Sequence, residues 1–208
     1  MTTLYIIRHG ETTGNDAGRF QGSTDCRLSE RGNQQIERLG ERCRNLPLEV
    51  LISSPLVRAR ETASAANRYH GLPVRIEPDV AEIHCGEMEE KTWDELRAQF
   101  PEVMAVWHDQ PWLFQSPGGE SMRDVYDRVV RALRRIVSEH RGKHVAVVSH
   151  GCAIRNALCF FHGLPLESIN EMPWVRNTSI SCIEWGDDDS VRIVSENDFE
   201  HVRDIVKL

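Results

Sequence analysis

The sequence predicts an α/β fold: a three-layer α/β/α sandwich with a mostly parallel central sheet, an antiparallel edge strand and a small helical cap insertion. Two observations predict it. Short apolar runs alternate with segments of helical periodicity, which is typical of a parallel sheet covered on both faces. The last two apolar runs, 179–185 and 191–197, are joined only by the turn GDDDS, which indicates antiparallel pairing. With 208 residues, the chain is long enough for one sizeable domain, 1–208.

The N-terminal segment predicts a strand, a loop and a helix. Residues 4–7 are a compact apolar run and predict a central strand. Residues 10–28 are rich in Gly, Thr, Asn and Asp and predict a loop. Ser29 is expected to cap a helix with apolar residues at helical spacing, and Pro47 is expected to end it.

A second strand and helix follow. Residues 50–52 predict a short strand. Ser54 is then expected to cap a helix with Pro55 at its first position, where the missing N–H costs nothing. Residues 74–76 predict a third, weaker strand.

Residues 86–120 differ in character and predict the cap insertion. Thr92 and Glu95 form a capping box for a short helix. Three prolines break the segment, and it is rich in aromatic side chains: Trp93, Phe100, Trp107, Trp112 and Phe114. Two interpretations stay open, because these aromatic residues can line a binding site or serve only for packing.

The C-terminal half returns to alternating helices and strands. Ser121 opens a long helix with one apolar face. Residues 145–148 predict the clearest strand of the chain, and residues 153–161 predict the helix after it. Strands at 179–185 and 191–197 close the sequence.

Composition limits the classes of function. The net charge of -7 argues against a general nucleic-acid binder, because such proteins display a basic surface to phosphates. No apolar run approaches the roughly 20 residues needed to span a bilayer, and the N-terminus lacks a signal-peptide pattern. The six scattered cysteines form no C-x-x-C pair and indicate reduced thiols in a cytoplasmic protein. Oligomeric state stays open, a homodimer included.

Three predicted strand ends carry residues suited to chemistry. Arg8 and His9 follow the first strand, Arg58 lies one helical turn beyond the second, and His150 follows the strand 145–148. In open α/β sheets, ligands bind beyond the carboxyl ends of the strands. Two imidazoles and two guanidiniums in one pocket suit a phosphate dianion.

Backbone groups are expected to contribute to this anion site. The predicted helix N-termini after Ser54 and Gly151 would present N–H groups and the positive ends of helix dipoles. Gly10 and Gly151 would let the main chain approach the ligand closely. The other histidines show no metal-ligand spacing, and the cationic side chains already supply positive charge, so the sequence predicts no metal and no cofactor.

The candidate residues lie within a longer series of motifs. In chain order these are RHGET, LSERG, SSPLVRARETA, AEIHCGEME, PGGES and VSHG. The series resembles the histidine phosphatase superfamily, also called phosphoglycerate-mutase-like, over essentially the whole chain. The resemblance implies an enzyme that acts on a small phosphorylated metabolite.

The resemblance implies a role for each matched residue. His9 would be the nucleophile that takes the phosphoryl group, and Glu82 would be the proton donor. Arg8, Arg58 and His150 would hold the oxygens of the transferring group. The residues expected to bind or border the substrate are Arg8, Asn15, Gln21, Gly22, Arg58, His150 and Gly151.

Elementary chemistry agrees with these roles. Phosphoryl transfer depends mostly on positioning and on stabilisation of charge. His9 must be unprotonated at its attacking nitrogen, and Arg8 and Arg58 should depress its pKa. Its other nitrogen is expected to bond a backbone carbonyl of the following loop, which would fix the tautomer. Glu82 must begin protonated, a form that the charge of a bound dianion favours.

Several alternatives stay open at this point. The short chain and the motifs PGGES, NTSIS and END resemble small bacterial-type phosphatases and favour hydrolysis. Phosphoglycerate mutase-type phosphoryl transfer is the first alternative, and a catalytically silent binding protein of the same fold is the second. His84 could touch substrate, and Glu120 could start a helix or line the pocket. At Met88 and Glu90 the chain departs from the family's common aromatic residue and second glycine.

Overall fold

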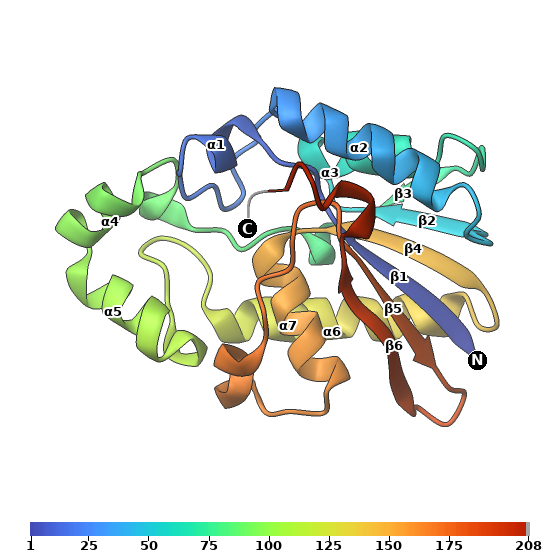
Figure 1. The fold of residues 1–208 in the computed structure, drawn as a ribbon. Helices are drawn as coiled ribbons and strands as arrows, with labels where there is room; N and C mark the ends of the chain where they lie inside the picture. The colour runs from blue at the N-terminus through green and yellow to red at the C-terminus, as the bar shows by residue number, and fades with distance from the viewer. Residues whose placement is uncertain (207–208) are drawn as a thin grey trace.

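In residues 1–206, which the computed structural model describes, six strands form one mixed sheet in the order β3-β2-β4-β1-β5-β6. Strands β3, β2, β4 and β1 run parallel, and β5 pairs antiparallel with both β1 and β6. The strands are β1 (Thr2–Arg8), β2 (Val50–Ser53), β3 (Val74–Ile76), β4 (His144–Ser149), β5 (Ile180–Trp185) and β6 (Val191–Asp198). The predicted α/β sandwich is confirmed (Figure 1).

Helices cover both faces of the sheet (Figure 1). One face carries α2 (Glu30–Cys43) and α3 (Val57–Ala66), and the other carries α6 (Met122–Glu139) and α7 (Gly151–Phe161). Successive residues of β1 therefore enter different hydrophobic clusters: Leu4 packs with the α6 and α7 side, and Tyr5 with the α2 and α3 side. Burial on both faces explains why this strand is a continuous apolar run rather than an alternating one.

The predicted cap is present as two short helices, α4 (Trp93–Gln99) and α5 (Pro101–Asp109), at the left of Figure 1. The capping box of Thr92 and Glu95 opens α4, as the sequence predicts. Pro101 begins the second helix at the position where a proline is tolerated. The cap shares its core with the sheet, because three of its side chains lie in the main hydrophobic cluster: Met88, Leu96 and Phe114.

Two boundaries near the N-terminus differ from the predictions. The expected loop 10–28 contains a short helix, α1 (Thr13–Asp16), because Thr12 and Asn15 form a capping box. The Ser29 hydroxyl caps α2 as predicted and accepts the Gly32 N–H at 3.0 Å. The helix nevertheless ends at Cys43, several residues before the proline that was expected to end it.

The prediction that Ser54 is the N-cap residue of α3 is wrong. This helix begins at Val57 rather than at Pro55, and its N-cap residue, Leu56, makes no side-chain capping bond. The Val57 N–H donates instead to the Asp25 carboxylate at 2.7 Å. The Ser54 hydroxyl bonds the ring of His150 at 2.6 Å and accepts the Leu56 N–H only at 3.4 Å.

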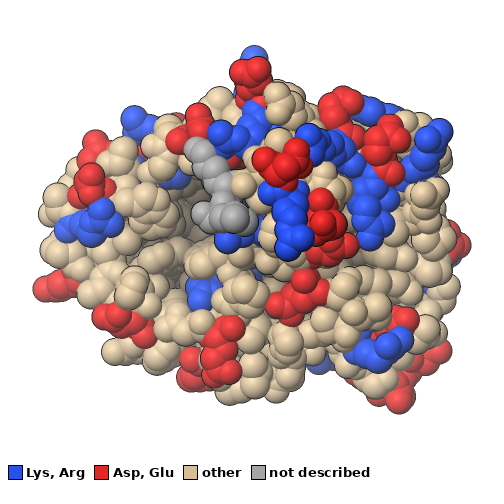
Figure 2. Space-filling model, viewed as in Figure 1, with Lys and Arg blue, Asp and Glu red and all other residues tan. Residues whose placement is uncertain are grey.

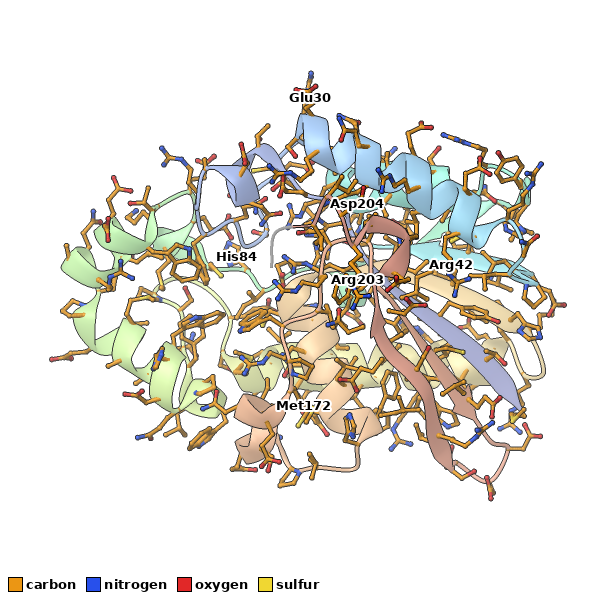
Figure 3. All side chains as sticks on the ribbon, in the orientation of Figure 1. Glu30, Arg42, His84, Met172, Arg203 and Asp204 are labelled. Carbon is orange, nitrogen blue, oxygen red and sulfur yellow. The ribbon has the colours of Figure 1, made fainter. Side chains whose placement is uncertain are left out.

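Charged side chains of both signs are interspersed over the α2 face (Figure 2). Arg42 of α2 pairs with Asp198, and Arg38 pairs with Asp204 near the C-terminus. Figure 3 labels Arg42 and Asp204. These pairs are largely exposed, and exposed pairs contribute only about 0–1 kcal/mol each. All six cysteines carry free thiols. No helix among the described residues has both the length and the apolar character needed to cross a membrane.

Candidate active site

Three strands end side by side at one edge of the sheet. Arg8 of β1 is opposite Ser149 of β4, and Ser53 of β2 is opposite Val148. The ladder continues one residue further, because the His9 N–H donates to the Ser149 carbonyl at 3.0 Å. The residues that follow these strands are therefore brought to the same edge, as the sequence predicts.

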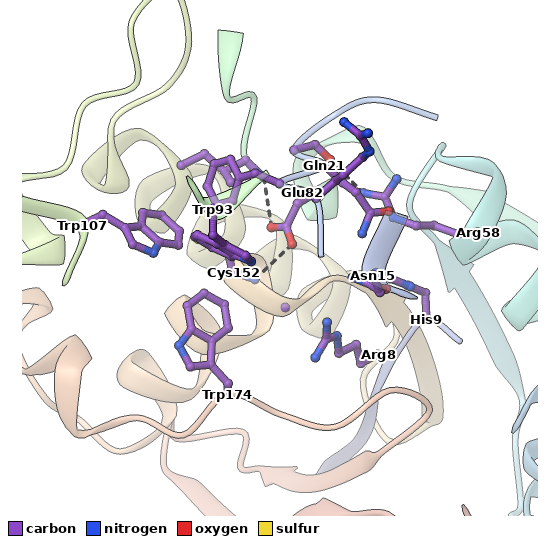
Figure 4. A pocket seen from close by; sticks show the side chains of 15 residues that line it. Arg8, His9, Asn15, Gln21, Arg58, Glu82, Trp93, Trp107, Cys152 and Trp174 are labelled. Atoms are coloured by element: carbon purple, nitrogen blue, oxygen red, sulfur yellow. Dashed lines mark hydrogen bonds between the residues drawn. The ribbon is translucent and has the colours of Figure 1, made fainter. Parts of the chain in front are cut away.

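A cavity of about 360 Å³ opens between this edge and the cap. Figure 2 shows this face hollowed beside the cap. In Figure 4, Arg8, His9 and Arg58 lie on one side of the cavity, three tryptophans lie on the other, and Glu82 lies between them. The predicted site residues that line it are Arg8, His9, Asn15, Gln21, Gly22, Arg58, Glu82 and Gly151.

His9 is held in one tautomer. Its Nδ1 lies 2.7 Å from the Gly10 carbonyl oxygen, the kind of loop carbonyl that the sequence predicts. A carbonyl only accepts, so Nδ1 must carry the proton. The lone pair of the neutral ring is then on Nε2. The ring is buried, with 3% of its surface exposed, and it lines the cavity.

The environment keeps His9 neutral. Burial is the main cause that lowers its pKa well below 6.5, and the charges of Arg58 and Arg8 add to the effect. The sequence identified the arginines but not the larger contribution of burial. The pKa of His150 is lowered in the same way, first by burial and then by Arg58.

Arg58 and His150 form one hydrogen-bonded unit. The Arg58 Nε donates to His150 Nδ1 at 3.2 Å, which makes Nδ1 an acceptor. In the neutral ring, Nε2 then carries the proton that bonds Ser54 Oγ at 2.6 Å. The other Arg58 nitrogens donate to the carbonyls of Thr24 and Gly22. His150 is fully buried and does not line the cavity, so in this structure it orients Arg58.

Arg8 retains a donor without a protein acceptor. Its Nη1 donates to the Val175 carbonyl at 2.5 Å, whereas its buried Nε has no hydrogen-bond partner. Burial lowers the pKa of the guanidinium to about 10, which leaves it charged at neutral pH. A buried donor without a partner is costly.

Three backbone N–H groups orient the Glu82 carboxylate. Ile83 and Ala153 donate to Oε1 at 3.0 and 3.2 Å, and Cys152 donates to Oε2 at 3.1 Å. Two of these donors belong to the first turn of α7. The N-termini of α7 and α3 were expected to present N–H groups to the anion. In the structure, N–H groups of α7 bind Glu82 and the first N–H of α3 binds Asp25.

Gly10 has a different role from the expected approach to the ligand. A Cβ at this position would lie 2.9 Å from Ile36 Cγ2 and 3.1 Å from the Gly32 carbonyl. The glycine is therefore required by close packing on α2. At Gly151 a Cβ would lie 3.5 Å from Arg8 Cζ, which is ordinary contact.

The structure places Glu120 and His84, whose roles the sequence left open, and also Glu11, which follows Gly10. Glu11 is buried and accepts from Ser29 and Arg31, so it anchors the loop to α2. Glu120 forms an ion pair with Arg128 at 2.7 Å and does not line the cavity. The His84 side chain is exposed and also does not line it.

Several cavity residues were not identified as site residues from the sequence. Trp93 and Trp107 come from the aromatic cap, whereas Trp174 comes from the segment before β5. The ring centroids of Trp107 and Trp174 lie 5.9 Å apart, so the cap contacts the segment before β5 beside the cavity. Trp174 stands alone in its sequence segment, and no local signal marks it. The other lining residues that the sequence did not single out are Arg19, Phe20, Ile83 and Cys152.

The segment before β5 also holds the backbone of Arg8 and His9. The Asn177 side chain donates to the His9 carbonyl at 2.9 Å. The Thr178 N–H donates to the Arg8 carbonyl at 3.0 Å. Within residues 1–206, no group of three or more His, Cys, Asp or Glu side chains is placed to hold a metal ion.

His9 and His150, both buried at the site, predict a pH dependence of stability. Below the ordinary histidine pKa of 6.5, the unfolded chain binds protons that folded His9 and His150 do not. The two neutral rings make their full contribution to the free energy of unfolding above that pH. The contribution is lost as the pH falls toward the lowered pKa values of the folded rings. In this window we expect the free energy of unfolding to fall by about 1.4 kcal/mol per pH unit for each ring.

Urea unfolding at several pH values from about pH 6.5 to about pH 4.5 measures this slope, which approaches its full value about one unit below the ordinary pKa. In the variant His9→Asn, unfolding should take up about one proton fewer, so the slope of the free energy of unfolding against pH should be smaller by the contribution of one ring. An unchanged slope in that variant would show that His9 is not held neutral in the folded state.

Comparisons with known proteins agree with this geometry. A profile of the histidine phosphatase superfamily (branch 1) matches residues 4–198. Phosphoserine phosphatase 1 of Hydrogenobacter thermophilus is 34% identical over 80% of this chain and 79% of its own length. "Probable phosphoglycerate mutase GpmB" of Erwinia tasmaniensis is 33% identical over 88% and 85%. The solved structure of Bacillus stearothermophilus YhfR has a TM-score of 0.93 and 33% identity, and the match covers 98% of this chain and 100% of that one.

The profile spans nearly the whole chain, and similar proteins include both phosphatases and proteins named for phosphoglycerate mutase. The predicted family resemblance is confirmed. The chain belongs to branch 1 of the histidine phosphatase superfamily.

Proposed function

We propose that this protein hydrolyses small phosphomonoesters through a phosphohistidine intermediate on His9, with Glu82 as general acid and base and without a metal. One observation carries the proposal. The Nδ1 proton of His9 is held by the Gly10 carbonyl, so a buried neutral ring has its Nε2 lone pair available in a cavity whose lining includes Arg8 and Arg58. A neutral imidazole in this state is a competent nucleophile.

In the first half-reaction, Arg8 and Arg58 hold the phosphoryl oxygens and neutralise their charge. His9 Nε2 forms a bond to phosphorus as the ester P–O bond breaks. Glu82 gives its proton to the leaving oxygen, and the alcohol departs. His150 contributes by orienting Arg58 through the Nε–Nδ1 hydrogen bond.

In the second half-reaction, the Glu82 carboxylate accepts a proton from water. The water oxygen bonds to phosphorus, and the N–P bond breaks. Inorganic phosphate leaves, His9 is again neutral, and Glu82 again carries its proton. The same group serves as acid and then as base, as microscopic reversibility requires.

The two ends of the cavity indicate the class of substrate. The phosphate end carries Arg8 and Arg58, whereas the far end is walled by Trp93, Trp107 and Trp174 (Figure 4). Aromatic faces bury large apolar areas. We therefore expect the ester's organic part to have an apolar surface that lies against these rings.

We expect release of phosphate from p-nitrophenyl phosphate to persist in EDTA, since the guanidiniums supply the positive charge. Strict dependence on added metal would contradict the mechanism.

Phosphoglycerate mutase-type transfer is the second candidate, because relatives of similar identity are named for it. With 2,3-bisphosphoglycerate present, we expect no efficient interconversion of 3- and 2-phosphoglycerate. Fast interconversion would favour the mutase instead.

The physiological substrate can be sought by a phosphate-release screen over a panel of phosphorylated metabolites. The His9→Ala protein serves as the blank in that screen. Esters with apolar organic parts should give the highest kcat/KM. A best substrate with a small, fully polar organic part would contradict the role given to the aromatic wall.

A further inference from the structure

Arg128 of α6 lies outside the cavity, yet every one of its donors is used on the segment that carries Glu82 or on Glu120. Its Nε and Nη2 donate to the two Glu120 carboxylate oxygens at 2.7 and 3.0 Å. Its Nη1 donates to the carbonyls of Asp79 and Ala81 at 2.9 and 2.8 Å, and Nη2 also donates to the Glu82 carbonyl at 3.0 Å. An arginine has five N–H donors, and these contacts account for five hydrogen bonds.

Glu120 holds the same segment from its other end. Its Oε2 accepts the His84 N–H at 2.8 Å, and its own N–H donates to the His84 carbonyl at 2.8 Å. The Arg128 side chain is 11% exposed and the Glu120 side chain is 26% exposed, so the pair is partly shielded from water. Arg128 and Glu120 together therefore fix the backbone on both sides of Glu82.

This support is needed because the segment has no regular structure of its own. After the 3-10 turn at Pro78–Val80, residues 81–85 are neither helix nor strand. The Glu82 carboxylate must still meet the N–H groups of α7 and face the leaving oxygen. A misplacement of about 1 Å in a catalytic group can cost about 100-fold in rate.

We propose that Arg128 and Glu120 are positioning residues for the proton donor and act on the leaving-group step through Glu82. The proposal rests on the function given to Glu82 above. It predicts a loss that depends on the leaving group, because only a poor leaving group needs the proton. An ion pair that merely stabilised the fold would affect all substrates alike.

The test compares kcat/KM of Arg128→Lys for glycerol phosphate, an alkyl ester, and for p-nitrophenyl phosphate, whose leaving group departs without a proton. Lysine keeps the charge but cannot make the five directed bonds. We expect a loss of about 10-fold to 100-fold for glycerol phosphate and less than about threefold for p-nitrophenyl phosphate. Equal losses on both substrates, or no loss on either, would overturn the proposal.

Arg131→Lys is the matched control. Arg131 lies on the same helix, is 62% exposed, and approaches the Asp79 carboxylate at 3.8 Å rather than the backbone of the Glu82 segment. Arg131→Lys should leave kcat/KM unchanged for both substrates. If Arg128→Lys does not fold, Glu120→Gln provides the same comparison and should show the same dependence on the leaving group.

A double variant separates failure of this proposal from failure of the proposed function. In the Glu82→Gln background, Arg128→Lys should lower kcat/KM for glycerol phosphate little further, because Arg128 acts through a carboxyl group that is already removed. Additive losses would overturn the positioning role while leaving Glu82 as the donor. If Glu82→Gln itself affects both substrates equally, the donor assignment and this inference both fail.

Discussion

Replacing His9 by alanine is expected to reduce kcat for every phosphomonoester by about 10⁴-fold to 10⁶-fold, the scale seen when a covalent nucleophile is removed. Neither arginine nor Glu82 can replace the Nε2 lone pair. Water would have to attack the ester directly, at a cavity built for a nitrogen nucleophile. Phosphate release by the purified variant under saturating substrate measures the loss.

His84→Ala provides the control for the loss of an imidazole near the site. Its side chain is exposed and lies outside the cavity, so turnover should remain unchanged. The unfolding transition of His9→Ala should remain cooperative, which separates loss of chemistry from loss of fold. Turnover by a folded His9→Ala protein at a rate close to that of the parent would contradict the assigned nucleophile.

Replacing Glu82 by glutamine is expected to slow hydrolysis of esters with poor leaving groups by about 10²-fold to 10⁴-fold. The amide oxygen can still accept the Ile83 and Ala153 N–H groups, which both bind Oε1, whereas the NH₂ group cannot accept the Cys152 N–H that binds Oε2. The amide cannot deliver a proton to the leaving oxygen. The loss for p-nitrophenyl phosphate should be smaller, since p-nitrophenolate leaves unprotonated.

The measurement is a comparison of kcat/KM between glycerol phosphate and p-nitrophenyl phosphate for parent and variant. Glu87→Gln is the control, because Glu87 is an exposed carboxylate in the same motif and should affect neither substrate. Identical losses on the two esters in Glu82→Gln would show that this carboxyl group is not the proton donor.

The parts of the site that follow from local pattern could be predicted from the sequence. Apolar runs mark the strands, and the residue after each run must lie at the carboxyl edge, which places Arg8, His9 and His150. The backbone partner of His9 could also be predicted, since the second ring nitrogen of such a histidine often bonds a nearby backbone carbonyl. The cap could be predicted because prolines and aromatic residues interrupt the periodic pattern.

Contacts between distant segments could not be predicted in this way. Ser54 has every local feature of a helix cap, yet its hydroxyl bonds a ring 96 positions away. Arg58 bonds the carbonyls of Gly22 and Thr24 because the loop folds over α3, which no spacing indicates. The support of Glu82 by Arg128 likewise depends on how α6 packs beside an irregular segment.

A phosphorylated ring at His9 is the central step of the proposed mechanism, and trapping that intermediate tests it most directly. Parent enzyme is mixed with ³²P-labelled substrate, quenched rapidly with denaturant at alkaline pH, and digested. We expect label that is stable to base, labile to acid, and located on the peptide that contains His9. No label, or label of that stability on a different residue, would contradict the account.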